Sequence, residues 1–194
     1  MPEREPPQPL DPVDSDWFRA LWGRQSVGDR VDDAGMASIA DVESDQPEFA
    51  ARVRAAFDAH GHKLLATLRA DGSPRISGNE ASFAGGELWL AGMPKSVKFG
   101  DMRRDPRVAL HSGSDEPDAF SADAKLSGRA VEITAERERA AFAEAASVPA
   151  EHSGFELFRI ELDQVVLVAL NDEKTALVIT SWRPGRGLTT TSRT

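Results

Sequence analysis

Residues 96–112 read SVKFGDMRRDPRVALHS, and this stretch decides the expected fold and the first functional hypothesis. Ser96 favours a helix start, Pro106 ends that helix, and the apolar run after it predicts a strand. With Lys95, the stretch carries five cationic side chains against two aspartates, whereas the whole chain has a formal net charge of −9. Because a helix N-terminus offers free backbone N–H groups, we expect a small anion here, most naturally a phosphate.

Two turn signals in front of this stretch predict hairpins. The dipeptide DG at 71–72 suits a type I′ turn, because both central positions of that turn need a positive φ. The dipeptide GG at 85–86 is the second turn signal. On the strand between the two turns, Arg75, Ser77 and Asn79 share one face by the two-residue period. The pattern predicts an antiparallel meander with one polar face.

Over the rest of the chain the patterns predict about seven strands and few helices. The expected strands span 63–69, 74–83, 87–91, 107–111, 124–133, 155–170 and 175–181. The expected helices span 46–59, 96–104 with Ser96 as cap, and 134–147 with Thr134 as cap. Because hairpins join the strands without regular βαβ alternation, we expect a mainly β (α+β) fold, an antiparallel six- to seven-stranded barrel with flanking helices.

We expect one folded domain with an extension at each end. Residues 1–15 are rich in proline and acid and are predicted to form a mobile arm. Residues 16–44 form an N-terminal extension in which aromatic and leucine side chains have the spacing of a short amphipathic helix. The folded domain is expected at 45–187, and residues 188–194 are interpreted as a C-terminal tail.

The composition excludes several classes of protein. The acid excess argues against non-specific nucleic-acid binding, which depends on lysine and arginine. The chain has no cysteine, which excludes disulfides, cysteine-ligated zinc, iron–sulfur clusters and thiol nucleophiles. No run approaches the roughly 18 apolar residues that span a bilayer, and no apolar signal region opens the sequence. We therefore expect a soluble, cytoplasmic protein that binds neither nucleic acid nor membranes.

The common motifs of catalysis and metal binding are not found. The sequence has no GxxxxGK[ST], GxGxxG, GxSxG or HExxH. His60 and His62 lack a nearby third ligand, so the pair is interpreted as a solvated helix end and no metal is expected. His111 follows the basic stretch and is a candidate to approach a bound ligand. No catalytic residue is assigned.

Five motifs, taken together, carry a resemblance to a known family. They are DGSPRIS (71–77), LWLAGMPKS (88–96), VKFGDMRRDPRVAL (97–110), GRAVEI (128–133) and TSWRPGRG (180–187). Their order and spacing over about residues 45–187 resemble the pyridoxamine 5′-phosphate oxidase-like flavin-binding split barrels. The resemblance implies a split β-barrel, a homodimer, and flavin mononucleotide (FMN) or a related deazaflavin in each of two grooves at the dimer interface.

The resemblance also implies the residues that bind the cofactor. By position these are Arg75, Ile76, Ser77, Leu90, Ala91, Ser96, Val97, Lys98 and Trp182. Lys98 aligns with the lysine that grips the cofactor phosphate. Val97 stands where the family often has an arginine, so Arg75, Lys95 or Arg104 must supply the second cation or that contact is missing.

Trp182 matches a late tryptophan that in the family lies near the cofactor of the partner chain, and a plain core position is the alternative interpretation. The chain ends in WRPGRGLTTTSRT, without the Arg-x-His type substrate motif of the vitamin B6 oxidases. Oxidation of pyridoxamine phosphate itself is therefore not expected.

Two functions of different classes follow from the resemblance. In the first, the chain is a flavin-dependent oxidoreductase that transfers hydride to or from a small organic substrate, and the cofactor ring carries the chemistry. In the second, the same groove binds flavin or a tetrapyrrole such as heme without turnover, as in a carrier, sensor or stress protein. Within the first, FMN is the preferred cofactor and a deazaflavin coenzyme is the alternative.

Overall fold

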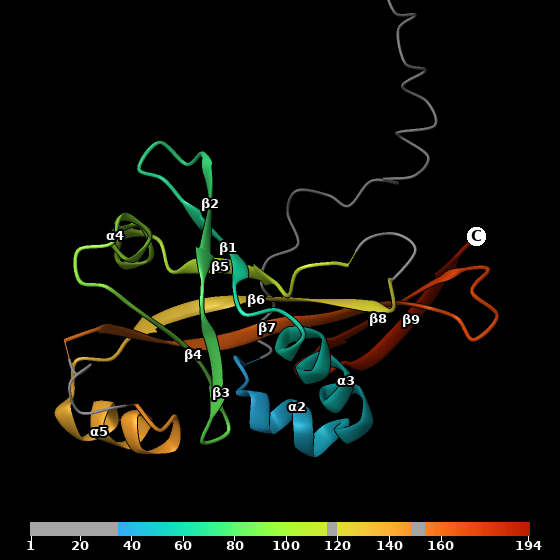
Figure 1. Cartoon of the computed structure of the whole chain (residues 1–194), viewed down its shortest axis with the longest axis horizontal. Helices are drawn as coiled ribbons and strands as arrows, with labels where there is room; N and C mark the ends of the chain where they lie inside the picture. The colour runs from blue at the N-terminus through green and yellow to red at the C-terminus, as the bar shows by residue number, and fades with distance from the viewer. Residues whose placement is uncertain (1–34, 116–119, 149–153) are drawn as a thin grey trace, which may run out of the picture. The chain divides into compact units, whose positions relative to one another are not determined.

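The computed structural model describes residues 35–115, 120–148 and 154–194, and the expected mobile arm and short N-terminal helix lie outside these ranges. The described part contains nine strands and four helices (Figure 1). The strands are β1 Lys63–Leu68, β2 Pro74–Asn79, β3 Ala81–Ala84, β4 Glu87–Gly92, β5 Arg107–His111, β6 Ala122–Glu132, β7 Glu156–Leu170, β8 Leu177–Arg183 and β9 Gly187–Arg193. The helices are α2 Ile39–Asp45, α3 Pro47–Asp58, α4 Val97–Arg104 and α5 Glu136–Ala145.

All strand pairs between these elements are antiparallel, as expected from the hairpin signals. The order across the sheet is β2-β1-β5-β6-β7-β4-β3, and β8 also pairs with β7 and carries β9. Strand β7 pairs with β6 over most of its length. On its other edge, the first part of β7 pairs with β4 and the last part pairs with β8.

The second predicted strand, 74–83, is wrong as one element. It is divided at Glu80 into β2, which pairs with β1, and β3, which pairs with β4. At the division the Asn79 side-chain amide donates to the carbonyl of Glu80. This local bond competes with strand pairing, which is how asparagine interrupts regular structure. The expected three-stranded meander is therefore two hairpins, and one continuous length of chain passes between them (Figure 1).

The C-terminal tail expected at 188–194 is also wrong, because residues 187–193 form strand β9. Gly185 and Gly187 take positive φ values of 69° and 64° in the turn after β8. Glycine reaches this backbone region without steric cost, so the chain reverses there and runs back along β8. The threonines of β9 favour the extended backbone.

The residues that begin the helices also differ from those that the sequence predicts. Ser96 is the N-cap residue of α4, but its Oγ donates to the carbonyl of Met93 at 2.7 Å and makes no capping bond. Ala135, not Thr134, is the N-cap of α5. Helix α2 was not expected, although Ser38 and Asp41 form a capping box at its start.

The helix expected at 46–59 is confirmed by α3, whose predicted face is buried. Phe49, Val53 and Phe57 are all in the main hydrophobic cluster, with Phe57 fully buried. A smaller cluster lies under α5, where Trp89 and Phe142 pack with ring centroids 5.2 Å apart. No helix in the described ranges is long and apolar enough to cross a membrane.

Gly128 allows a close approach between the backbones of β6 and β7. The register of β6 against β7 shifts between Ser127 and Gly128, which marks a bulge. A Cβ added at Gly128 would lie 1.9 Å from the carbonyl oxygen of Glu161. Backbone on both sides forms this contact, so the two strands would have to separate to accept any side chain.

We expect Gly128→Ala to lower the free energy of unfolding by about 3 kcal/mol or more, at the upper end for overpacking. Gly100→Ala is the control, because a Cβ at this exposed position in α4 meets nothing within 4 Å. That variant should be neutral or gain up to about 1 kcal/mol from helix propensity. Urea unfolding of both variants measures the effect. If the two variants were equally stable, the close backbone contact at Gly128 would be contradicted.

Candidate functional site

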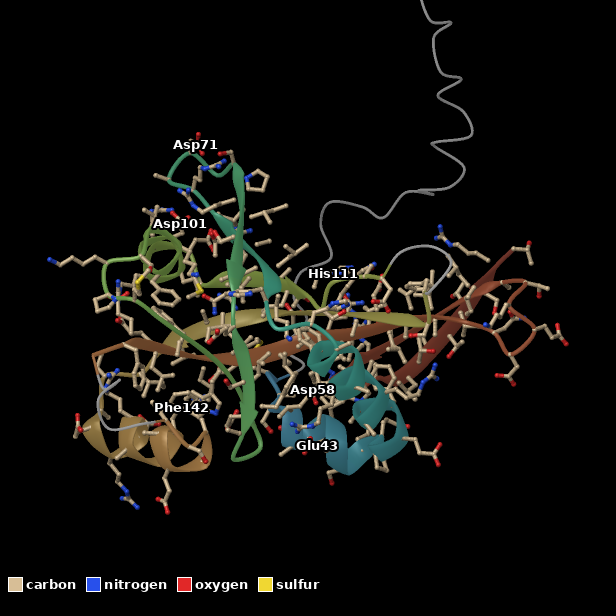
Figure 2. The ribbon with its side chains drawn as sticks, in the orientation of Figure 1. Glu43, Asp58, Asp71, Asp101, His111 and Phe142 are labelled. Atoms are coloured by element: carbon tan, nitrogen blue, oxygen red, sulfur yellow. The ribbon has the colours of Figure 1, made fainter. Side chains whose placement is uncertain are left out.

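Strand β2 and helix α4 lie against each other and bring the expected phosphate-binding residues together. The Arg75 Nε of β2 donates to Asp101 Oδ2 of α4 at 2.6 Å. Farther along the same two elements, Lys98 Nζ donates to the carbonyl of Gly78 at 2.9 Å. Figure 2 shows Asp101 where α4 faces the β1–β2 hairpin. Arg75 and Lys98 therefore belong to one cluster, which we call the β2–α4 cluster, with Asp101 at its centre.

Asp101 is the buried carboxylate of this cluster, with 4% of its side chain exposed. It accepts hydrogen bonds from Thr67 Oγ1 at 3.1 Å, from Arg75, and from Arg104 Nη2 at 2.8 Å. Burial raises the pKa of Asp101, but the hydrogen bonds from Arg104, Arg75 and Thr67 together outweigh burial and hold the pKa below its ordinary value. Asp101 is thus an ionised anchor for two arginines.

Lys98 has a different environment. Burial lowers the pKa of its ammonium group. Its Nζ lies 5.6 Å from the ring centroid of Phe99, and no ion pair of Lys98 occurs within the described part of the chain. A partly desolvated cation without a carboxylate partner attracts an anion from outside the protein.

Val97 does not contribute to charge recognition, since it is an aliphatic residue with 63% exposure. Three residues were expected to replace the missing cation. Arg104 uses Nη2 on Asp101 and on the carbonyl of Leu68. Lys95 is exposed, with a φ of 65°. Arg75 is engaged at Nε, and no hydrogen bond of its Nη atoms is found among the described residues. Arg75 is therefore the best-placed second cation.

The other expected cofactor-binding residues on strands differ in access. Ile76 is 73% exposed, and Ser77 is half-buried beside it. Leu90 is fully buried in the main core, so its side chain cannot touch a ligand and only its backbone is available. Ala91 is half-buried at the edge of the smaller cluster.

Trp182 lies apart from the β2–α4 cluster and is 3% exposed. Its Nε1 donates to Asp45 Oδ2 at 2.7 Å, which joins β8 to the end of α2. It lines a cavity of about 550 Å³ together with Asp41, Asp45 and the turn between β8 and β9. Within one chain, Trp182 is therefore a core residue with one edge at a cavity.

The histidines do not gather around the cluster. His111 Nδ1 accepts the N–H of Gly113 at 3.0 Å, and its Nε2 lies 3.6 Å from Asp123. His111 pairs with Leu64 of β1, which in turn pairs with Gly78. That places His111 two strand spacings, about 10 Å, from the Lys98 contact. In the described ranges no group of three or more potential ligands suits a metal ion.

The sequence analysis did not recognise Asp101 as the centre of the site. Arg104 pairs with Asp101, and Arg107 pairs with Asp105. Arg103 instead binds Glu132, with its Nε 2.9 Å from Oε2. The signal for Asp101 was its place one helical turn after Lys98, opposite the strand that carries Arg75.

Comparison with known proteins agrees with this fold and with the sequence motifs. Residues 49–169 match the family model described as pyridoxamine 5′-phosphate oxidase. This chain belongs to the pyridoxamine 5′-phosphate oxidase family. No curated protein matches its sequence significantly. The expected family and its split β-barrel fold are confirmed, with more strands than the six or seven predicted.

Two solved structures illustrate the shared fold of the family. A pyridoxamine 5′-phosphate oxidase-related, FMN-binding protein from Nostoc punctiforme is 12% identical with a TM-score of 0.55, covering 76% of this chain and 95% of its own. PhzG from Burkholderia lata, solved with tetrahydrophenazine-1-carboxylic acid, is 16% identical with a TM-score of 0.52, covering 87% and 98%. At these identities the likeness shows the fold alone.

The lowered pKa of Asp101 predicts a pH-dependent stability difference. A carboxylate whose pKa is lower in the folded state stabilises the fold above its unfolded pKa of about 3.9, and this contribution is lost as the pH falls through the folded pKa. Asp101→Asn should therefore lower the free energy of unfolding by about 1–3 kcal/mol at pH 7. The difference from wild type should shrink below about pH 4. Urea titrations at several pH values test this, and a constant difference would contradict it.

Proposed function

We propose that this chain is a flavin-dependent oxidoreductase that binds FMN at the interface of a homodimer and transfers hydride to or from a small organic substrate. The single observation that supports it most is the β2–α4 cluster. There a partly desolvated Lys98 without a carboxylate lies one helical turn before Asp101, which binds Arg75 at Nε, and the terminal nitrogens of Arg75 make no hydrogen bond in the described structure. Family membership provides the context for the flavin.

The donor set of the cluster fits the phosphoryl end of FMN. Lys98, Arg75 and Arg104 supply three cations, and Asp101 neutralises one of them. Two positive charges remain, which match a phosphate dianion. Val97, which precedes Lys98 and is exposed, adds apolar surface beside the cluster, and such surface suits the planar face of an aromatic ring.

In this proposal the cofactor carries out the redox chemistry, and the protein binds and orients the cofactor. A bound flavin supplies hydride exchange through its ring. Lys98 and Arg75 hold the phosphoryl group, and the backbone of β4 near Ala91 lines the groove. Apolar residues keep water from the ring. Solvent supplies protons, since the cluster contains no histidine, and Asp101, with a lowered pKa, stays ionised.

A second copy of the chain is the proposed partner, and the surface formed by β1 and β2 is its proposed docking face. Ile76 pairs with Ala66, and Leu64 lies on the same face of β1 with 49% of its surface exposed. Ala66 pairs in turn with Ala109 of β5, which extends the apolar surface across three strands. Adjacent exposed aliphatic side chains of this kind mark protein interfaces. The family resemblance makes the second copy the occupant.

The experiment that tests the function is identification of the cofactor. Protein purified in native form is denatured, and the released small molecule is analysed by absorption spectroscopy and mass spectrometry. FMN with turnover of a nicotinamide donor supports the proposal. A deazaflavin would change the cofactor and keep the enzyme class. A tetrapyrrole, or FMN that no donor or acceptor reduces or oxidises, would favour a carrier, sensor or stress protein.

Replacing Lys98 tests the phosphate contact. Lys98→Ala should weaken FMN binding by roughly 1.5 to 3 kcal/mol, the range for a charge-assisted hydrogen bond, which is about 10- to 150-fold in Kd. Lys174→Ala removes an exposed lysine in the turn after β7 and should leave the Kd unchanged. Fluorescence titration measures both, and unchanged affinity in Lys98→Ala would remove Lys98 from the site.

Replacing Ile76 tests the dimer. Ile76→Asp places a charge on the proposed interface and should convert a dimer to a monomer that retains FMN poorly, because the groove needs both chains. Leu188→Asp is the control, since Leu188 is an exposed aliphatic residue on β9, away from the proposed interface. Sedimentation velocity reports the masses. A wild-type monomer that holds FMN tightly would overturn the proposed interface.

A further inference from the structure

Arg75 makes its ion pair with Asp101 through a single nitrogen, Nε, unlike two other arginines of this chain. Arg107 binds Asp105 through both Nε and Nη2, and Arg103 binds Glu132 through the same two atoms. Arg75 uses Nε alone on Asp101. In the described part of the chain neither of its Nη atoms makes a hydrogen bond, and a quarter of the side chain is exposed. The guanidinium is therefore held at Nε, and its two Nη groups remain available as donors.

Asp101 itself is fixed from three sides. Thr67 on β1 is buried and donates to its Oδ2, and Arg104 on α4 donates to its Oδ1. Arg104 is in turn tied to the carbonyl of Leu68 by a 2.7 Å bond. A carboxylate held by donors from β1, β2 and α4 cannot change position when a ligand binds. It therefore sets where the plane of the Arg75 guanidinium lies.

The geometry points to Asp101 as a positioning residue for a phosphate monoester: it holds Arg75 through Nε so that both Nη groups donate together to one phosphoryl group, with Lys98 donating from the same helix. This inference rests on the proposed function and adds the part of the cofactor on which Asp101 acts. A planar guanidinium bound in this way gives a bidentate contact to phosphate, whereas a loose side chain must lose rotamer freedom first.

A purely structural ion pair makes a different prediction. Loss of structure at Asp101 would weaken binding of every flavin to the same degree. Loss of positioning would weaken only ligands that carry the phosphate. FMN and riboflavin share the ring and ribityl chain and differ in the phosphoryl group, so the ratio of their affinities isolates the role of Asp101.

The experiment titrates FMN and riboflavin separately into the cofactor-free full-length chain and follows flavin fluorescence. Wild type should prefer FMN. Asp101→Asn should lower FMN affinity about 10-fold and leave riboflavin affinity unchanged, so that the preference falls by the same factor. Asp105→Asn is the matched control, because Asp105 follows the same helix but binds Arg107. It should keep the wild-type preference.

Arg75→Lys is a second variant that leaves the buried carboxylate with a cation beside it. A lysine ammonium is a point charge and lacks the planar set of N–H donors of a guanidinium. It therefore cannot bind Asp101 and, at the same time, donate to two oxygens of the phosphate. This variant should also lose FMN preference and keep riboflavin affinity. Thermal unfolding of both variants confirms that they are folded under the titration conditions.

The outcomes separate the two proposals. Wild type that binds neither flavin overturns the proposed function, and the role of Asp101 with it. Wild type that binds both flavins equally overturns the role of Asp101 and leaves the flavin site standing. Asp101→Asn that loses both ligands equally, or that behaves like Asp105→Asn, does the same.

Discussion

The fold depends on one strand that serves three neighbours. Strand β7 is hydrogen-bonded to β6 along one edge, and its other edge is shared between β4 near Phe158 and β8 near Val168. Antiparallel pairing requires continuous extended backbone over this whole length, and alternate side chains of β7 are buried. Because β4 and β8 pair with different parts of β7, the sheet separates into two parts, and β6 stays paired with β7 on both sides of the bulge at Gly128.

Local patterns in the sequence were enough to predict most of the elements. Turn dipeptides located the two early hairpins, and four-residue spacing located α3, whose Phe57 is fully buried. The break at Glu80 was missed because nothing in residues 74–83 distinguishes one strand from two; which neighbour each half pairs with is decided by the rest of the sheet. Strand β9 was missed because its threonines are exposed and have no apolar alternation, so only pairing with β8 makes them a strand.

The sequence also predicted only some of the residues of the candidate site. Arg75 and Lys98 were named through the family motifs, and the structure places both in the β2–α4 cluster. The role of Asp101 was hidden because acid next to arginine is ordinary on a solvated helix, and burial is a property of the folded chain. Trp182 lies against Asp45, away from the cluster, so a part for it at the cofactor needs the second chain of the proposed dimer.

The β8–β9 hairpin is attached to the rest of the fold mainly through β8, so its outer strand β9 should be the more dynamic of the two. Its pairing with the body runs through the end of β7, helped by the bond from Trp182 to Asp45, while β9 is exposed and pairs only with β8 in the described structure. Segments with few buried contacts open with free energies below that of global unfolding. Amide hydrogens of β9 should therefore exchange with solvent through local opening, whereas those shared by β6 and β7 should persist until the whole domain unfolds.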